Sequence, residues 1–70
     1  MRETFGLTEQ RVLEIMHSVP EITTARLAED LGISGNAVGH ALRRLRSRGL
    51  VIWEKSGPIT FWRIQRRKVG

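Results

Sequence analysis

The chain of 70 residues contains no cysteine. Disulfide bonds and thiolate metal sites are therefore excluded, and the stability of the fold must come from apolar packing. No segment approaches the roughly 20 apolar residues that a membrane span needs, and the first ten residues contain no apolar run of signal-peptide length. We therefore expect a soluble, intracellular protein that binds no membrane, in either the cytoplasm or the nucleus.

The chain also lacks the motifs of catalysis. Its two histidines, His17 and His40, fall on different predicted helices, without cysteine or paired carboxylates at metal-ligand spacing. No glycine-rich phosphate loop and no nucleophile motif is present. We expect no enzyme activity, no cofactor and no metal site.

Seventy residues leave room for one domain with a small core. We expect a single domain over residues 1–70, with an ordered core at about 8–64 and a basic tail at 65–70. The tail carries Arg66, Arg67 and Lys68, which suit either an additional phosphate contact or a disordered end.

The stretch 27–48 predicts a helix-turn-helix. Apolar residues recur at helical spacing on both sides of a short turn, Gly32 stands where a helix C-terminus favours a left-handed residue, and Ser34 is placed to cap the following helix. Two helices joined this tightly cross steeply and leave the outer face of the second helix free to enter a nucleic-acid groove.

The flanking segments complete the fold. A first helix is predicted from Thr8, as its cap, to about Ser18 or Val19, where Pro20 ends it. Residues 22–23 are expected to form a very short strand, and Thr24 to cap the second helix, while the third helix should stop at Gly49. The strand-like runs at 50–55 and 59–64 predict a hairpin with residues 56–58 at or near its tip. The expected fold class is α+β: a winged helix-turn-helix of three helices and a C-terminal β-hairpin wing.

Charge is divided between the two halves of the chain. Residues 1–33 hold three basic and six acidic side chains, a net charge of −3, whereas residues 34–70 hold nine basic and one acidic, a net charge of +8. Such a field attracts a polyanion to the C-terminal half and orients it there. The alternative is a basic surface that only keeps the domain soluble.

The pattern TTARLAEDLGISGNAVGHALRRLRSRGLV, followed by the hairpin, resembles winged-helix regulators of the MarR and ArsR type over roughly residues 8–64. This resemblance implies a domain that binds duplex DNA through its third helix and wing. Winged helices also include binders of RNA and of other proteins.

A narrower resemblance concerns ITTARLAEDLG and SGPITFWRI, which are similar to the Z-alpha domains that bind left-handed DNA or RNA. Pro58 and Trp62 match the wing proline and the tryptophan of that family. Its helix-three asparagine and tyrosine fall on Gly39 and Arg43, and the chain contains no tyrosine. The resemblance therefore implies half of a left-handed-binding signature.

The candidate site residues belong to the exposed face of the third helix and to the wing. Arg43 suits guanine or a phosphate, Asn36 suits adenine or a phosphate, and a glycine at position 39 permits close approach of a strand. Each has a simpler alternative: a solvated arginine, a residue that favours helix starts, and a tolerated glycine. Trp53 and Trp62 are expected to pair across the hairpin, chiefly for packing, although Trp62 also offers a stacking surface. The full candidate set is Ser34, Asn36, Gly39, His40, Arg43, Arg44, Ser47, Lys55, Pro58, Thr60, Trp62 and Arg63.

The sequence thus favours a small duplex-DNA-binding regulator whose third helix enters the major groove while the wing contacts the backbone. The alternatives are a Z-alpha-like binder of left-handed DNA or RNA and a winged helix that binds a protein. Duplex DNA is the expected partner, and a homodimer or a larger protein partner is compatible with the sequence.

Overall fold

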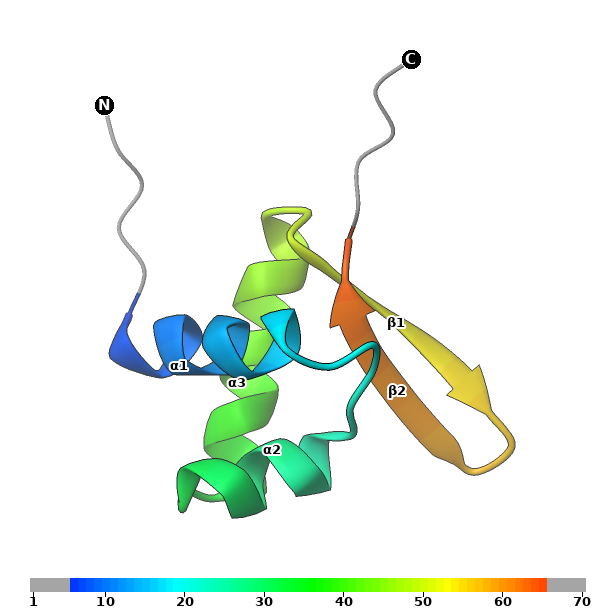
Figure 1. Ribbon diagram of the computed structural model, residues 1–70, viewed down its shortest axis with the longest axis horizontal. Coiled ribbons are helices and arrows are strands. Elements are labelled where there is room, and N and C mark those ends of the chain that lie inside the picture. Colours follow the sequence, from blue (N-terminus) through cyan, green and yellow to red (C-terminus); the bar gives the residue numbers. More distant parts are fainter. Residues whose placement is uncertain (1–5, 66–70) are drawn as a thin grey trace.

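The computed structural model describes residues 6–65 and has three helices followed by one antiparallel hairpin (Figure 1). The helices are α1 (Leu7–His17), α2 (Thr24–Leu31) and α3 (Gly35–Ser47), and the strands are β1 (Val51–Ser56) and β2 (Ile59–Ile64). Figure 1 shows α1 crossing α3 while the hairpin projects to one side of the helices. The predicted α+β winged helix-turn-helix is confirmed. Of the predicted basic tail at 65–70, all residues after Gln65 lie outside the described residues.

The start of α1 differs from the prediction that Thr8 caps it. Gly6 is the capping residue, in an extended conformation, and its N–H donates to the Glu9 carboxylate at 3.1 Å. Thr8 is the second residue of the helix. The carboxylate reaching back from the third helical position satisfies an N–H that the helix itself leaves unpaired, which explains why no hydroxyl is needed there. At its other end α1 stops at His17, shortly before Pro20, as the proline predicts.

The cap of α2 is one residue earlier than predicted. The Thr23 hydroxyl oxygen accepts from the Arg26 N–H at 3.1 Å, and Thr24 is the first helical residue. Immediately before this cap, Ile22 pairs with Trp62 of β2 through two backbone hydrogen bonds of 2.9 and 2.7 Å. The predicted short strand is therefore a single bridge at Ile22, which places Thr23 at the end of the extended segment.

The turn between α2 and α3 agrees with the prediction. Gly32 has a φ of +69°, in the left-handed region, and its N–H donates to the Ala28 carbonyl at 2.8 Å. The Ser34 hydroxyl oxygen accepts from the Ala37 N–H at 3.1 Å and caps α3. At its far end α3 stops at Ser47, within two residues of the predicted stop at Gly49, which itself has a positive φ.

The hairpin turns through two residues rather than three. Ser56 belongs to β1, so the turn consists of Gly57, with a φ of +64°, and Pro58. A positive φ followed by the fixed negative φ of proline is the combination of a type II′ turn, whose twist suits a two-residue hairpin. The resulting register pairs Trp53 with Trp62, as expected, and Ile52 with Arg63.

The core lies where the three helices meet the base of the hairpin. Its buried side chains come from every helix, from the bridge and from β1: Val12, Met16, Ile22, Leu27, Val38, Ala41, Leu42, Leu45 and Val51. Trp62 and Ile64 of β2 pack against this cluster and are half-buried. Four of the buried residues belong to α3, so the core fixes which face of that helix points outward.

Candidate nucleic-acid interface

The exposed face of α3 carries most of the side chains predicted for the third helix. One side of α3 is buried and consists of Val38, Ala41, Leu42 and Leu45. The helical period places four exposed residues on the opposite side of the helix. These residues are Asn36, His40, Arg43 and Ser47. The capping Ser34 is also exposed, one residue before the helix. The structure therefore brings Asn36, His40, Arg43 and Ser47 onto one face of α3, with Ser34 at its N-terminal end.

Gly39 lies at the edge of this face and is half-buried. Its backbone φ is not positive, and a Cβ built on it meets no atom within 4 Å. Neither local conformation nor internal packing within the described chain requires glycine here. Close approach of an external molecule remains a prediction for this position.

Arg44 points away from the centre of the face and toward α1. Its guanidinium lies 3.7 Å from the carboxylate of Glu9, whose side chain is only 6% exposed, whereas the side chain of Arg44 is 75% exposed. Glu9 thus accepts from Gly6 and faces Arg44 at the same time. This contact links the first turn of α1 to α3 and offsets part of the positive charge of Arg44.

Arg46 is a residue that the sequence reasoning did not select. The centre of its guanidinium lies 5.4 Å from the centroid of the Trp53 ring, within the range of a cation–π contact. The contact joins α3 to β1. The helical period could have indicated part of this position from sequence. It places Arg46 at one edge of the exposed face and Arg44 at the other, with Arg43 between them.

The wing has two chemically different faces. Trp53, Lys55, Thr60 and Trp62 share one face, because directly paired residues of an antiparallel hairpin point the same way and alternate residues repeat the direction. Since Trp53 contacts Arg46, this face is turned toward α3. Pro58 is exposed at the tip.

Arg63 lies on the opposite face of the hairpin, together with Ile52 and Glu54. It pairs with Ile52 in the register, and its guanidinium lies 3.5 Å from the Glu54 carboxylate. The structure therefore does not bring Arg63 together with Lys55 and Thr60, although all three were predicted as wing contacts.

Trp62 is fixed by backbone hydrogen bonds and by packing against the core. Its N–H and its carbonyl both bond to Ile22, so its pairing with Trp53 is of the non-hydrogen-bonded kind, in which the side chains approach closely. Trp62 is half-buried against the core, while Trp53 is 40% exposed. Packing accounts for Trp62, and a stacking role for it remains a prediction.

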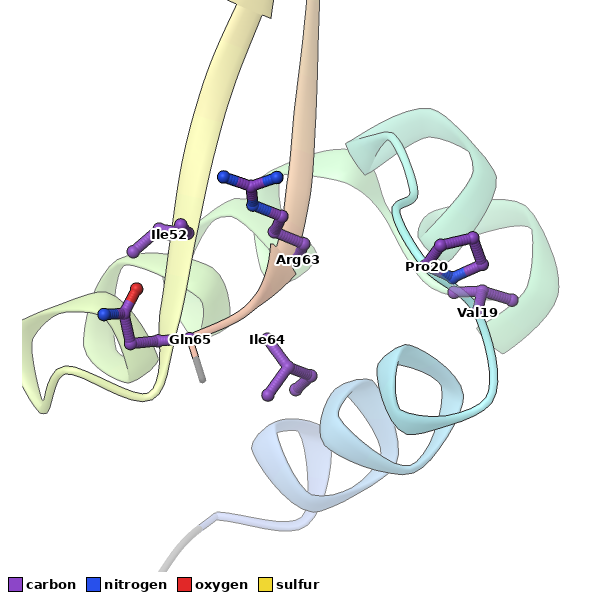
Figure 2. Close-up of a pocket in the computed structure, with 6 residues that line it drawn as sticks. All are labelled: Val19, Pro20, Ile52, Arg63, Ile64 and Gln65. Carbon is purple, nitrogen blue, oxygen red and sulfur yellow. The ribbon is translucent and has the colours of Figure 1, made fainter. Parts of the chain in front are cut away.

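One open hollow lies at the base of the hairpin rather than on the α3 face. Figure 2 shows the six residues that line this open space of about 510 Å³: Val19, Pro20, Ile52, Arg63, Ile64 and Gln65. Its charged member is Arg63, and it contains no member of the exposed face of α3.

Within residues 6–65, no three His, Asp or Glu side chains are grouped to hold a metal ion. None of the helices in this range is long and apolar enough to cross a membrane.

A family model for winged helix-turn-helix DNA-binding domains matches residues 7–52, which include all three helices and the start of β1. The chain belongs to the winged helix-turn-helix DNA-binding family. The prediction of a DNA-binding winged helix is thereby confirmed, and the family is one of DNA-binding domains rather than of enzymes. No curated protein matches the sequence closely enough to count as a relative.

Solved structures with the same fold support the resemblance to MarR-type regulators. The zinc-responsive MarR family member ZitR from Lactococcus lactis is 27% identical with a TM-score of 0.81, and the match covers 91% of this chain and 46% of that one. A point mutant of ZitR in complex with DNA is 25% identical with a TM-score of 0.80, over 87% of this chain and 43% of that one. The adhesin competence repressor AdcR from Streptococcus pyogenes is 22% identical with a TM-score of 0.82, over 87% and 47% of the two chains. The chain thus spans less than half the length of these proteins.

Proposed function

We propose that this winged helix is the DNA-binding part of a transcription regulator, and that α3 lies in the major groove of duplex DNA. The observation that carries the proposal is the exposed face of α3, where Asn36, His40 and Arg43 project from a helix whose other side is buried. An α-helix such as α3 is about 10–12 Å across with its side chains. A major groove of about 12 Å width accepts such a helix.

The side chains on this face have complementary chemistry for base edges and phosphates. Arg43, at the centre, is suited to the two acceptors of guanine, and Asn36, in the first turn, to adenine or to a phosphate favoured by the helix dipole. His40 is suited to a base edge or a phosphate. The hydroxyls of Ser34 and Ser47 lie near the two ends of the helix, where phosphates flank the groove.

The wing would contact the backbone beside the groove. Lys55 and Thr60 lie on the face turned toward α3, and Pro58 lies at the tip, so these residues approach the same duplex as α3 does. Arg63 lies on the other face and is paired with Glu54. We therefore expect Arg63 to contribute less to binding than Lys55.

The similarity to ZitR, a mutant of which has been solved in complex with DNA, supports this proposal. This chain spans less than half of the length of ZitR and AdcR, so the proposal covers DNA binding and not the functions of their remaining parts. An intracellular location follows from a DNA partner. A homodimer or a larger protein partner stays a prediction.

The test measures the fluorescence anisotropy of a labelled random-sequence duplex at several salt concentrations. Four cations, Arg43, Arg44, Arg46 and Lys55, are exposed on α3 and on the wing face turned toward it. If Arg43, Arg46 and Lys55 each neutralise one phosphate, while Glu9 offsets part of the charge of Arg44, log K should fall against log salt with a slope of about −3. Binding that does not change with salt would contradict the proposal, and the absence of binding at low salt would contradict it and favour a protein-binding module.

A further inference from the structure

The contact between Arg46 and Trp53 suits an anion clamp, by which we mean an arginine that is held in place while its N–H donors stay available to an anion. The central guanidinium carbon of Arg46 lies over the Trp53 ring, 5.4 Å from its centroid, and within residues 6–65 the N–H donors of this side chain have no hydrogen-bond or ion-pair partner. Those in-plane donors are the ones that form paired hydrogen bonds with phosphate oxygens. The ring thus restricts the motion of Arg46 without occupying its hydrogen-bonding groups.

The surroundings of Arg46 favour an anion over any other ligand. Arg46 lines a shallow hollow of about 340 Å³ together with Arg43 and Ser47. Arg26, Arg44 and Arg63 form ion pairs with carboxylates, but neither Arg43 nor Arg46 forms one with a carboxylate of residues 6–65. Two guanidinium groups and a hydroxyl around one hollow, without a carboxylate in its lining, are complementary to a single phosphate group.

The position of the hollow identifies which anion it would hold. It lies at the C-terminal end of α3, beside the start of the wing, between the residues proposed to read bases and the strand proposed to contact the backbone. We propose that Arg46 and Ser47 bind one backbone phosphate of the DNA, next to the base-reading Arg43, and that Trp53 is the positioning residue that holds Arg46 in place. This inference rests on the proposed function, because the phosphate belongs to the duplex whose groove holds α3.

The structural alternative is that Arg46 only covers the exposed ring of Trp53. Under that alternative the pair stiffens the wing and has no ligand. The two explanations differ in one measurable property. An arginine that binds a phosphate contributes to the salt dependence of DNA binding, whereas an arginine that only covers the Trp53 ring, a ring cover, does not.

The experiment compares the wild-type chain with Arg46→Ala, Trp53→Leu and Trp53→Phe, and uses Arg26→Ala as the control. Arg26 is also an exposed arginine, but Asp30 on its own helix holds it at 3.2 Å, away from the hollow. Affinity for a labelled random-sequence duplex is measured at several salt concentrations. Thermal unfolding followed by circular dichroism confirms that each variant is folded at the temperature of the assay.

Arg46→Ala should weaken binding about tenfold at low salt and make the salt slope shallower by about 0.9, the contribution of one phosphate. Trp53→Leu keeps every charge, yet it should weaken binding about twofold to fivefold, which corresponds to an exposed cation–π contact. It should also make the slope shallower, and Trp53→Phe should restore part of both. In the variant Arg46→Ala, the further change Trp53→Leu should have little effect on affinity. The control Arg26→Ala should leave the slope unchanged.

The outcomes separate the two levels of the proposal. If the wild type binds with the expected salt dependence but Arg46→Ala and Trp53→Leu keep its slope, the clamp is wrong and Arg46 is only a ring cover. If Arg26→Ala lowers the slope as much as Arg46→Ala does, the effect is one of net charge, and the clamp is again refuted. If the wild type itself shows no salt-dependent binding, the proposed function fails, and the inference fails with it.

Discussion

Glu9 provides a direct test of how α1 is attached to the helix that carries the candidate interface. Its carboxylate is buried and has two partners, the Gly6 N–H at 3.1 Å and the Arg44 guanidinium at 3.7 Å. The first contact satisfies an unpaired N–H at the start of α1, and the loss of a helix cap costs typically about 1 kcal/mol. Because Gly6 is exposed, water can replace the lost acceptor, which keeps the cost of this part low.

The ion pair with Arg44 contributes less than its charges suggest. The side chain of Arg44 is 75% exposed, so solvent screens the interaction, and such pairs contribute about 0–1 kcal/mol. We therefore expect Glu9→Ala to lower the free energy of unfolding by about 1.5–2 kcal/mol once the lost packing of the buried stem is included. Glu9→Gln keeps an acceptor for Gly6 and should cost about half as much, and Arg44→Ala should cost less than about 1 kcal/mol.

The measurement is urea or thermal unfolding of these three variants and of the double variant of Glu9→Ala with Arg44→Ala. In a domain of this size, 1 kcal/mol corresponds to a change of about 4–8 °C in Tm. The double-mutant cycle should give a coupling energy of no more than about 1 kcal/mol. If Arg44→Ala destabilises the protein as strongly as Glu9→Ala, then the ion pair rather than the cap attaches α1, and the reasoning from exposure is refuted.

Two further predictions concern recognition of the duplex. Arg43→Ala should cost about 1–3 kcal/mol of binding free energy and relax the preference at one base position, whereas Lys55→Ala should weaken binding to all sequences about equally; equal, sequence-independent losses in a binding-site selection assay would make Arg43 a phosphate contact. The chain should not convert an alternating CG duplex to the left-handed form at moderate salt, because Gly39 and Arg43 stand where Z-alpha domains carry asparagine and tyrosine. Inversion of the long-wavelength circular dichroism bands of that duplex at stoichiometric protein would contradict this and favour the Z-alpha-like alternative.

The helical part of the fold could be predicted from sequence because its signals are local. The period of the apolar residues defines the buried face of α3, and Gly32 and Ser34 mark the turn by their own backbone and hydroxyl chemistry. The caps of α1 and α2 were less predictable. Thr23 and Thr24 have the same hydroxyl, and the choice between them depends on the bridge between Ile22 and Trp62, which are far apart in the sequence.

The two faces of the wing could be predicted from sequence, because the expected pairing of Trp53 with Trp62 fixes the register, but the grouping of Arg63 with Lys55 and Thr60 did not apply that register. With a two-residue turn, Ser56 pairs with Ile59, and Arg63 therefore points away from Lys55. A change of one residue in the register would reverse which face each side chain occupies. The contact between Arg46 and Trp53, by contrast, could not be predicted from sequence, because it depends on the angle at which the hairpin leaves α3.

Gly39 offers a test in which stability and binding should change in opposite directions. Glycine inside a helix costs about 0.5–1 kcal/mol relative to alanine, and a Cβ at this position meets no atom within 4 Å. Gly39→Ala should therefore raise the free energy of unfolding by about that amount. If the glycine is present because a DNA strand approaches the backbone of α3, the same change should weaken duplex binding. Gly35→Ala is the matched control, since a Cβ there also meets nothing within 4 Å and the residue starts the same helix. A Gly39→Ala variant that is more stable and binds the duplex as tightly as the wild type would show that close approach at this position is not needed.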